Sequence, residues 1–220
     1  MFREILKLLN RDNLHVQALS ECYQMIDICD EMLRAAVESL RERDDASMDI
    51  DIYKMDKRLN SFERDVRRKV MTHLALGHTA DLASGLTLVS IVIDLERIGD
   101  YTKNIYDLAV HHPTRLDAGE FESQLDRIET VALENFRRTA KAFKSGDVDE
   151  ARSLMHDYKE DISARVREVE AKLVEGSTTL PVADAVSLAL YLRFLKRISA
   201  HSRNLVSSLV NPLDRIGYEE

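Results

Sequence analysis

Apolar residues recur at intervals of three and four along most of the chain, which is the period of an amphipathic helix. The pattern predicts a short helical piece at the N-terminus, followed by six long helices. Their expected ranges are 12–43, 47–75, 79–112, 118–144, 148–175 and 181–211. No segment shows a convincing strand pattern, so the predicted fold class is all-α.

Short polar connections separate these helices. Breaks are expected at Gly77, Pro113, Gly119, Gly176 and Pro181. Because short connections join antiparallel neighbours, each half of the chain is expected to be an up-down-up bundle of three helices. We therefore predict two tandem three-helix bundles, formed by residues 1–115 and 116–220.

The two halves carry related sequences. Segment 95–105 has a near-copy one hundred residues later, at 195–205, which retains an Arg-Ile pair and an asparagine. The copy replaces both carboxylates of the first segment. Such self-similarity indicates an internal duplication, in which each repeat is a unit whose apolar face needs a partner.

The first of these segments places two carboxylates on one helix face. Glu96 and Asp100 lie four residues apart, which corresponds to ~6 Å of helical rise. Gly99 lies between them, although glycine inside a helix costs roughly 1 kcal/mol relative to alanine. A glycine at such a position indicates a packing or functional reason.

A second pair of oxygen-bearing side chains, Asp56 and Asn60, has the same spacing. If helices 47–75 and 79–112 are antiparallel, this pair can face Glu96 and Asp100, as facing carboxylates do in metal-binding bundles. Oxygen ligands suit Mg²⁺, Mn²⁺, Ca²⁺ or iron better than a structural zinc ion. The sequence therefore predicts a metal site at these four residues.

The same spacing has a simpler interpretation. Glu96 and Asp100 can form ordinary ion pairs with Arg97, Lys103 or Lys57 on a solvated surface, where such pairs contribute little to stability. Spacing alone does not decide between ion pairs and a metal, and both hypotheses stay open here.

Composition narrows the function classes. The chain has 220 residues, of which 45% are hydrophobic and 32% charged, as in a soluble globular protein. Its net charge of −8 argues against a broad nucleic-acid surface. The basic run 64–69 can attract an anionic partner, but a solvated helix face paired with Glu63 and Asp65 is the simpler interpretation.

Cysteine usage and segment hydrophobicity indicate a cytoplasmic protein. Cys22 and Cys29 are seven residues apart on one helix, too far along it for a disulfide of ordinary geometry. The start of the chain lacks the apolar core of a secretory signal, and no segment has the ~20 apolar residues that span a bilayer. Attachment to a membrane is expected only through a partner.

Taken together, the six-helix duplication and three segments resemble the PhoU family over nearly the whole chain. The segments are 56–60, 96–105 and 145–151. The resemblance implies that each repeat carries two acidic motifs that hold metal ions at the bundle surface. Glu96 and Asp100 match one motif in full, and Asp56 matches the first position of the other.

Departures from the family pattern limit this expectation. Asn60 replaces an acid in the first repeat but keeps an oxygen ligand. In the second repeat Lys196 and Ala200 replace the acids, and in one alignment Arg165 follows Asp161; a shifted alignment pairs Asp157 with Asp161 instead. We therefore expect at most one metal centre, in the first repeat.

The resemblance implies a regulator of phosphate uptake and phosphate-starvation signalling that contacts a membrane transporter, and in addition a sensor histidine kinase. It implies no catalysed reaction, and it suggests a homodimer. The start of the chain, residues 1–7, also looks like PhoU-domain proteins that accompany sodium-phosphate cotransporters, so the Pst type and the cotransporter type of partner both stay open.

Two other functions are retained as alternatives. One is a metal-free helical scaffold or transporter accessory whose acidic site has become a set of ion pairs. The other is a metal-dependent phosphohydrolase, because paired carboxylates with a metal can activate water. The sequence lacks a glycine-rich phosphate loop and a recognisable nucleophile motif, which disfavours an enzyme.

Overall fold

The computed structural model describes residues 13–112, 114–160 and 162–218, and within these ranges the chain is helical without strands. The α-helices are α2 (Leu14–Glu42), α3 (Ile52–Ala75), α4 (Leu82–His111), α5 (Glu122–Ser145), α6 (Val148–Glu160), α7 (Ile162–Val174) and α8 (Val182–Val210). Short 3₁₀ turns, η1 (Thr79–Asp81), η2 (Gly119–Phe121) and η3 (Leu213–Arg215), precede α4 and α5 and follow α8. The all-α prediction is confirmed.

Most predicted helix boundaries agree with the structure within a few residues. The predicted helix 148–175 comprises α6 and α7, which flank residue 161; that residue and the N-terminal piece lie outside the described residues. The predicted start at residue 47 is wrong, because α3 begins at Ile52. There Asp51 caps the helix by accepting a hydrogen bond from the Lys54 backbone N–H at 2.9 Å.

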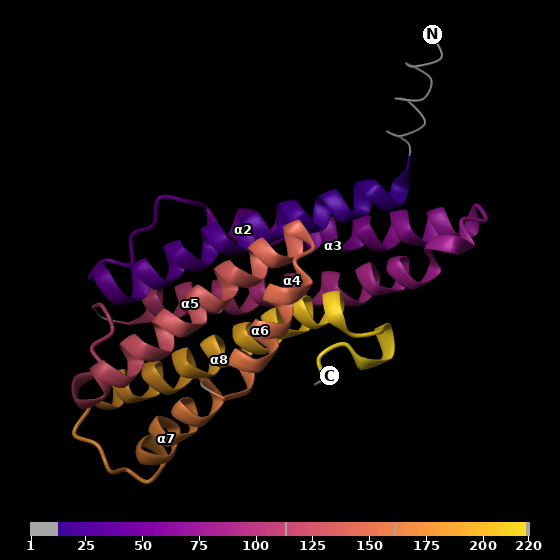
Figure 1. Cartoon of the computed structure of the whole chain (residues 1–220). Helices are drawn as coiled ribbons and strands as arrows, with labels where there is room; N and C mark the ends of the chain where they lie inside the picture. Colours follow the sequence, from indigo (N-terminus) through magenta and orange to yellow (C-terminus); the bar gives the residue numbers. More distant parts are fainter. Residues whose placement is uncertain (1–12, 113, 161, 219–220) are drawn as a thin grey trace.

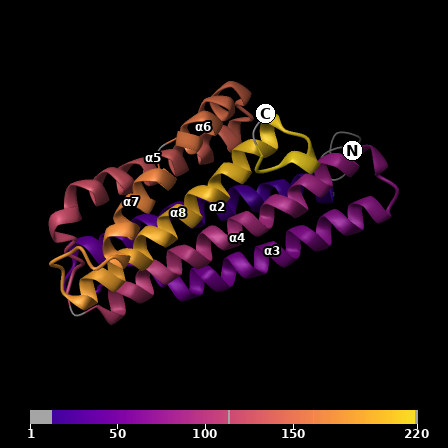
Figure 2. The same cartoon turned by 90° about the horizontal axis from the view of Figure 1, so that it is seen from below.

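The helices form two groups that lie against each other. In one group α2, α3 and α4 pack together, and in the other α8 packs against α5, α6 and α7. Figure 2 shows α4 between α3 and α8, so that α4 and α8 form the seam between the groups. The helices of the two groups lie along one another (Figure 1), and one hydrophobic core contains buried residues of both groups. The division into domains at residue 115 therefore stays a prediction.

A buried carboxylate fixes the seam. Asp94 on α4 is 8% exposed, and its Oδ1 accepts hydrogen bonds from Asn204 at 2.8 Å and from the His201 ring at 2.7 Å. Further along the seam Tyr101 contacts Phe194, with ring centroids 6.0 Å apart. From the first contact to the second, the residue number increases on α4, from 94 to 101, and decreases on α8, from 201 to 194. The two helices are therefore antiparallel.

These two contacts are also related by the duplication. An offset of one hundred residues converts the pair Asp94–His201 into the pair Phe194–Tyr101. Both pairs are in contact, as a two-fold relation between the repeats requires. The seam is therefore where the two repeats meet through equivalent helices.

A second polar contact joins the groups near the other end of the seam. Arg41 on α2 is largely buried and its Nε lies 2.9 Å from Glu129 on α5. Tyr191 on α8 donates a hydrogen bond of 2.7 Å to the same carboxylate. Burial raises the pKa of Glu129, although Arg41 and Tyr191 oppose this effect. The helices α2, α5 and α8, from both groups, thus meet at Glu129, whose negative charge is balanced by Arg41.

Both cysteines are free and buried in α2. Burial raises the pKa of Cys22 to about 12, so its thiol stays protonated at neutral pH. Cys29 donates a hydrogen bond from Sγ to the Leu95 carbonyl at 3.4 Å, which ties α2 to α4. In the part of the chain that the structure describes, no helix has both the length and the apolar character needed to cross a membrane.

We expect Asp94→Ala to lower the free energy of unfolding by about 3 kcal/mol, because it leaves the buried groups of His201 and Asn204 without their acceptor. Urea unfolding followed by circular dichroism measures this change. Asp30→Ala is the matched control, since its pair with Arg34 at 2.9 Å is solvent-exposed and should change stability by about 0.5 kcal/mol or less. Equal losses in the two variants would contradict the assigned role of Asp94.

Candidate functional site between α3 and α4

Gly99 permits α3 and α4 to approach closely at the predicted site. A Cβ atom at this position would lie 2.2 Å from Cδ1 of Leu59, far inside contact distance. Leu59 is only 1% exposed, so its side chain has little room to move away. The packing reason that the sequence predicted for Gly99 is therefore the passage of α3 across α4.

This close approach brings three of the four predicted ligands together. Asp56 on α3 and Asp100 on α4 are joined through Lys103, whose Nζ lies 2.9 Å from Asp56 Oδ1 and 3.1 Å from Asp100 Oδ1. Asn60 adjoins Asp56, but its amide nitrogen donates to the Asp56 backbone carbonyl at 3.0 Å within the same helix. The two acids thus share an ammonium group supplied by the chain.

Lys103 stays charged in this position. Burial opposes the charge, but the hydrogen bonds and negative charges of Asp56 and Asp100 outweigh burial and raise the pKa of Lys103. Its side chain is 23% exposed, so solvent still screens part of the interaction. Lys103 is therefore a fixed cation of the site rather than a proton donor.

Glu96, the fourth predicted ligand, lies beside this cluster. Burial raises its pKa first, and the negative charge of Asp100 adds to the effect. Arg97 opposes it and contacts both acids, at 3.1 Å from Asp100 and 3.5 Å from Glu96. Of the cations named from the sequence, Arg97 and Lys103 thus form the predicted ion pairs, while Lys57 is exposed and forms none with the described residues.

Sequence reasoning missed Glu63 as a neighbour of this site. Glu63 on α3 also raises the pKa of Glu96 through its negative charge. The signal in the sequence that could have identified Glu63 is its position seven residues after Asp56, on the same helix face.

The basic run 64–69 forms ion pairs within α3. Glu63 pairs with Arg67 at 3.0 Å, and Arg68 pairs with Asp65 at 3.0 Å. The predicted ion pairs of the basic run with Glu63 and Asp65 are confirmed, whereas Lys69 pairs with Glu21 on α2.

In the described structure a lysine lies among these donors. Among the described residues, no three His, Cys, Asp or Glu side chains gather in a way that can hold a metal ion. The ammonium of Lys103 lies between Asp56 and Asp100, where a shared cation would have to lie. A metal bound to all four predicted ligands would require the displacement of Lys103.

On α8 the second repeat has no acid at the two positions that correspond to Glu96 and Asp100. Lys196 and Ala200 lie on α8, and Arg165 lies exposed on α7. Asp157 is paired with Arg138 at 2.8 Å, and Asp161 lies outside the described residues.

Comparison with known protein families finds the same domain in both repeats. The family model described as "PhoU domain" matches residues 22–109 and 125–209. Curated relatives named "Phosphate-specific transport system accessory protein PhoU homolog" include a protein from Xylella fastidiosa (strain 9a5c), 24% identical over 206 residues, which covers 87% of this chain and 81% of the relative. A protein from Pseudomonas putida with the same name is 26% identical over 196 residues, at 87% and 75% coverage.

Solved structures show the same fold. PhoU from Pseudomonas aeruginosa superposes with a TM-score of 0.72 at 20% identity and covers 90% of this chain and 96% of its own. The phosphate transport system regulatory protein PhoU from Streptococcus pneumoniae gives a TM-score of 0.71 at 19% identity, with coverage of 92% and 94%. The similarity extends over both helix groups.

We expect Gly99→Ala to destabilise the protein by about 1 kcal/mol, because overpacking against Leu59 costs about 2 kcal/mol and outweighs the gain in helix propensity of about 1 kcal/mol. Urea unfolding of Gly99→Ala, Leu59→Ala and the double variant measures the coupling. In the Leu59→Ala background the clash is gone, so Gly99→Ala should stabilise. The same destabilisation in both backgrounds would refute the contact as the reason for the glycine.

Proposed function

Because the chain belongs to the PhoU family, we propose that it regulates phosphate uptake and phosphate-starvation signalling as a non-enzymatic, cytoplasmic accessory of a membrane phosphate transporter. The observation that carries the proposal is the match of both repeats to the PhoU domain. Four curated relatives, each matching 87% of this chain, are named as accessory proteins of the phosphate-specific transport system. These names are the support for phosphate transport as the process.

Those names also favour a Pst-type transporter over a sodium-phosphate cotransporter as the partner. The segment that suggested the cotransporter type, residues 1–7, lies outside the described residues. A sensor histidine kinase is the second partner that we propose, because signalling requires the transport state to reach the starvation response. Peripheral attachment to the membrane then follows from contact with the transporter.

An exposed apolar area at one end of the first helix group is suited to protein contacts. Met71 and Leu76 are 68% and 70% exposed, and Leu82 and Leu86 on α4 are 50% and 41% exposed. Isolated exposed apolar residues are common, but four of them on adjoining ends of α3 and α4 form a candidate interface. We propose this area for contact with the transporter or with a second copy in a homodimer.

We further propose that any divalent metal ion or iron in the first repeat competes with Lys103. Asp56, Asp100, Glu96 and Asn60 supply oxygen atoms of the kind that such ions prefer. The ammonium already pairs with two of these acids, so the binding free energy of a metal is reduced by the cost of breaking both ion pairs. The phosphohydrolase alternative receives no support from this arrangement. Asp56 and Asp100 pair with a lysine, whereas a hydrolase of this kind needs them to hold a metal ion that activates water.

Deletion of the gene in its native host tests the proposed function. We expect the initial rate of [³²P]phosphate uptake to change in phosphate-replete or phosphate-limited medium and to return with the wild-type gene. Complementation with Leu76→Asp should fail if the exposed apolar area is the contact surface, whereas Val174→Asp, a similarly exposed position on α7, should complement. Unchanged phosphate uptake in both media would contradict the proposal, and sulfate uptake serves as the specificity control.

The competition with Lys103 is tested by titrating purified protein with Mn²⁺ and measuring free ions by electron paramagnetic resonance. We expect Lys103→Gln to bind Mn²⁺ at least about tenfold more tightly than wild type, because it leaves Asp56 without its cation and Asp100 with Arg97 alone. Adding Asp100→Asn to this variant should remove the gain. Equal affinities of wild type and Lys103→Gln would contradict the competition.

A further inference from the structure

A pocket of about 150 Å³ lies between α8 and the α6–α7 segment of the second repeat. Its polar lining consists of Tyr158, Ser163, Lys196, Arg197, Ser199 and Arg203. Among the described residues none of the lining side chains is acidic. A cavity of this volume is large enough for several water molecules or a small oxyanion.

The α8 wall of this pocket is the duplicate of the acidic site in the first repeat. With the offset of one hundred residues, Lys196 replaces Glu96 and Ala200 replaces Asp100. Arg203 stands at the position of Lys103 and keeps its positive charge. Asp100, one of the two acids that hold the cation in the first repeat, and its neighbour Glu96 have therefore been lost, while the cation remains and a second cation has been gained.

Lys196 and Arg203 have unused capacity to donate hydrogen bonds. Lys196 is half-buried and forms no ion pair or hydrogen bond with the described residues. Arg203 donates from Nη2 to the Gly217 carbonyl at 2.9 Å, whereas its Nε is buried without a partner. Arg197 is turned away, with its guanidinium over the Tyr101 ring at 5.7 Å. Lys196 is therefore the lining cation whose hydrogen-bond donors all remain available to an anion.

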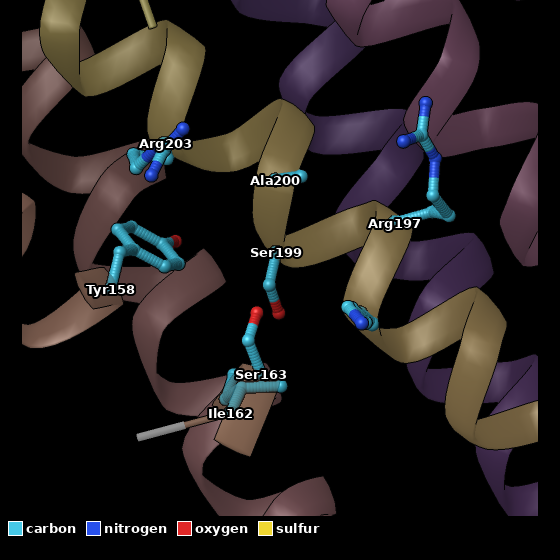
Figure 3. A pocket seen from close by; sticks show the side chains of 8 residues that line it. Tyr158, Ile162, Ser163, Arg197, Ser199, Ala200 and Arg203 are labelled. Atoms are coloured by element: carbon cyan, nitrogen blue, oxygen red, sulfur yellow. The ribbon is translucent and has the colours of Figure 1, made fainter. Parts of the chain in front are cut away.

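Neutral hydroxyl groups complete the lining. Figure 3 shows the hydroxyls of Ser163 on α7 and Ser199 on α8 directed toward one another across the pocket. Ser199 donates to the Leu195 carbonyl at 2.9 Å, and Ser163 forms no hydrogen bond with the described residues, so it is free to donate to a ligand. The duplicate of Ser199 is Gly99, where α3 closes against α4.

The geometry points to a binding site for a phosphate group in this pocket. Lys196 supplies the charge and the hydrogen-bond donors for a tetrahedral oxyanion, Arg203 a second positive charge, and Ser163 a neutral donor. The first repeat thus has an acidic site that holds a cation, and the second has a basic site for an anion. This inference is independent of the proposed partner, because binding is a property of the purified chain.

Isothermal titration of the full chain with inorganic phosphate, in a zwitterionic buffer of low ionic strength, tests the site. We expect saturable binding of one phosphate per chain that sodium chloride of equal ionic strength does not reproduce. Lys196→Gln should weaken binding about tenfold or more, while Lys196→Arg retains most of it. Lys57→Gln is the matched control, because it removes the same charge from an exposed position on α3.

Flotation with vesicles of phosphatidylcholine and phosphatidylglycerol distinguishes a lipid phosphate from the free ion. If inorganic phosphate binds and the binding depends on Lys196, the ligand is a free oxyanion. If inorganic phosphate does not bind but flotation with the vesicles depends on Lys196, the ligand is a lipid headgroup. The site is refuted if neither is bound, or if Lys196→Gln and Lys57→Gln weaken binding equally. Circular dichroism of each variant confirms that helicity is retained.

Discussion

The antiparallel packing of α4 against α8 is the constraint on which the rest of the structure depends. Buried residues occur along most of the length of both helices, and Asp94 can be buried only where His201 and Asn204 meet it. A shift of either helix by one turn would leave this carboxylate unpaired, so the hydrogen bonds specify one register. The remaining helices then cover the outer faces of the seam, α2 and α3 on α4, and α5, α6 and α7 on α8.

The same constraint explains how the two repeats acquired different surfaces. Each repeat must keep the residues that face the seam, but the face that points toward its own outer helices is free to change. In the first repeat Gly99 allows α3 to press against α4, and the acids there enclose Lys103. In the second repeat Ser199 faces a pocket, and the acids are replaced by Lys196 and Ala200. The duplicated frame thus carries an acid at Glu96 in one repeat and a base at Lys196, the equivalent position, in the other.

The sequence predicted the helices, the duplication and the opposing pairs on α3 and α4, because these follow from local periodicity and spacing. It also predicted that Arg97 or Lys103 would pair with Asp100. It could not predict the start of α3, which is decided by a single capping residue, Asp51, after a polar stretch. Nor could it predict that Lys103 would also contact Asp56, or that Asp94 would contact His201 more than one hundred residues away, because both depend on how separate helices are aligned. The metal and the domain division remain predictions.

Native-state hydrogen exchange tests the central role of the seam most directly. Because one core joins both helix groups, we predict that the slowest amides of α4 and α8 exchange with the same free energy, equal to that of global unfolding. Amides of α6, which packs in a small separate cluster with Ala142 and Val206, should exchange through a lower-energy opening. Different free energies for the slowest amides of α4 and α8 would show that the two halves unfold separately and would contradict the account.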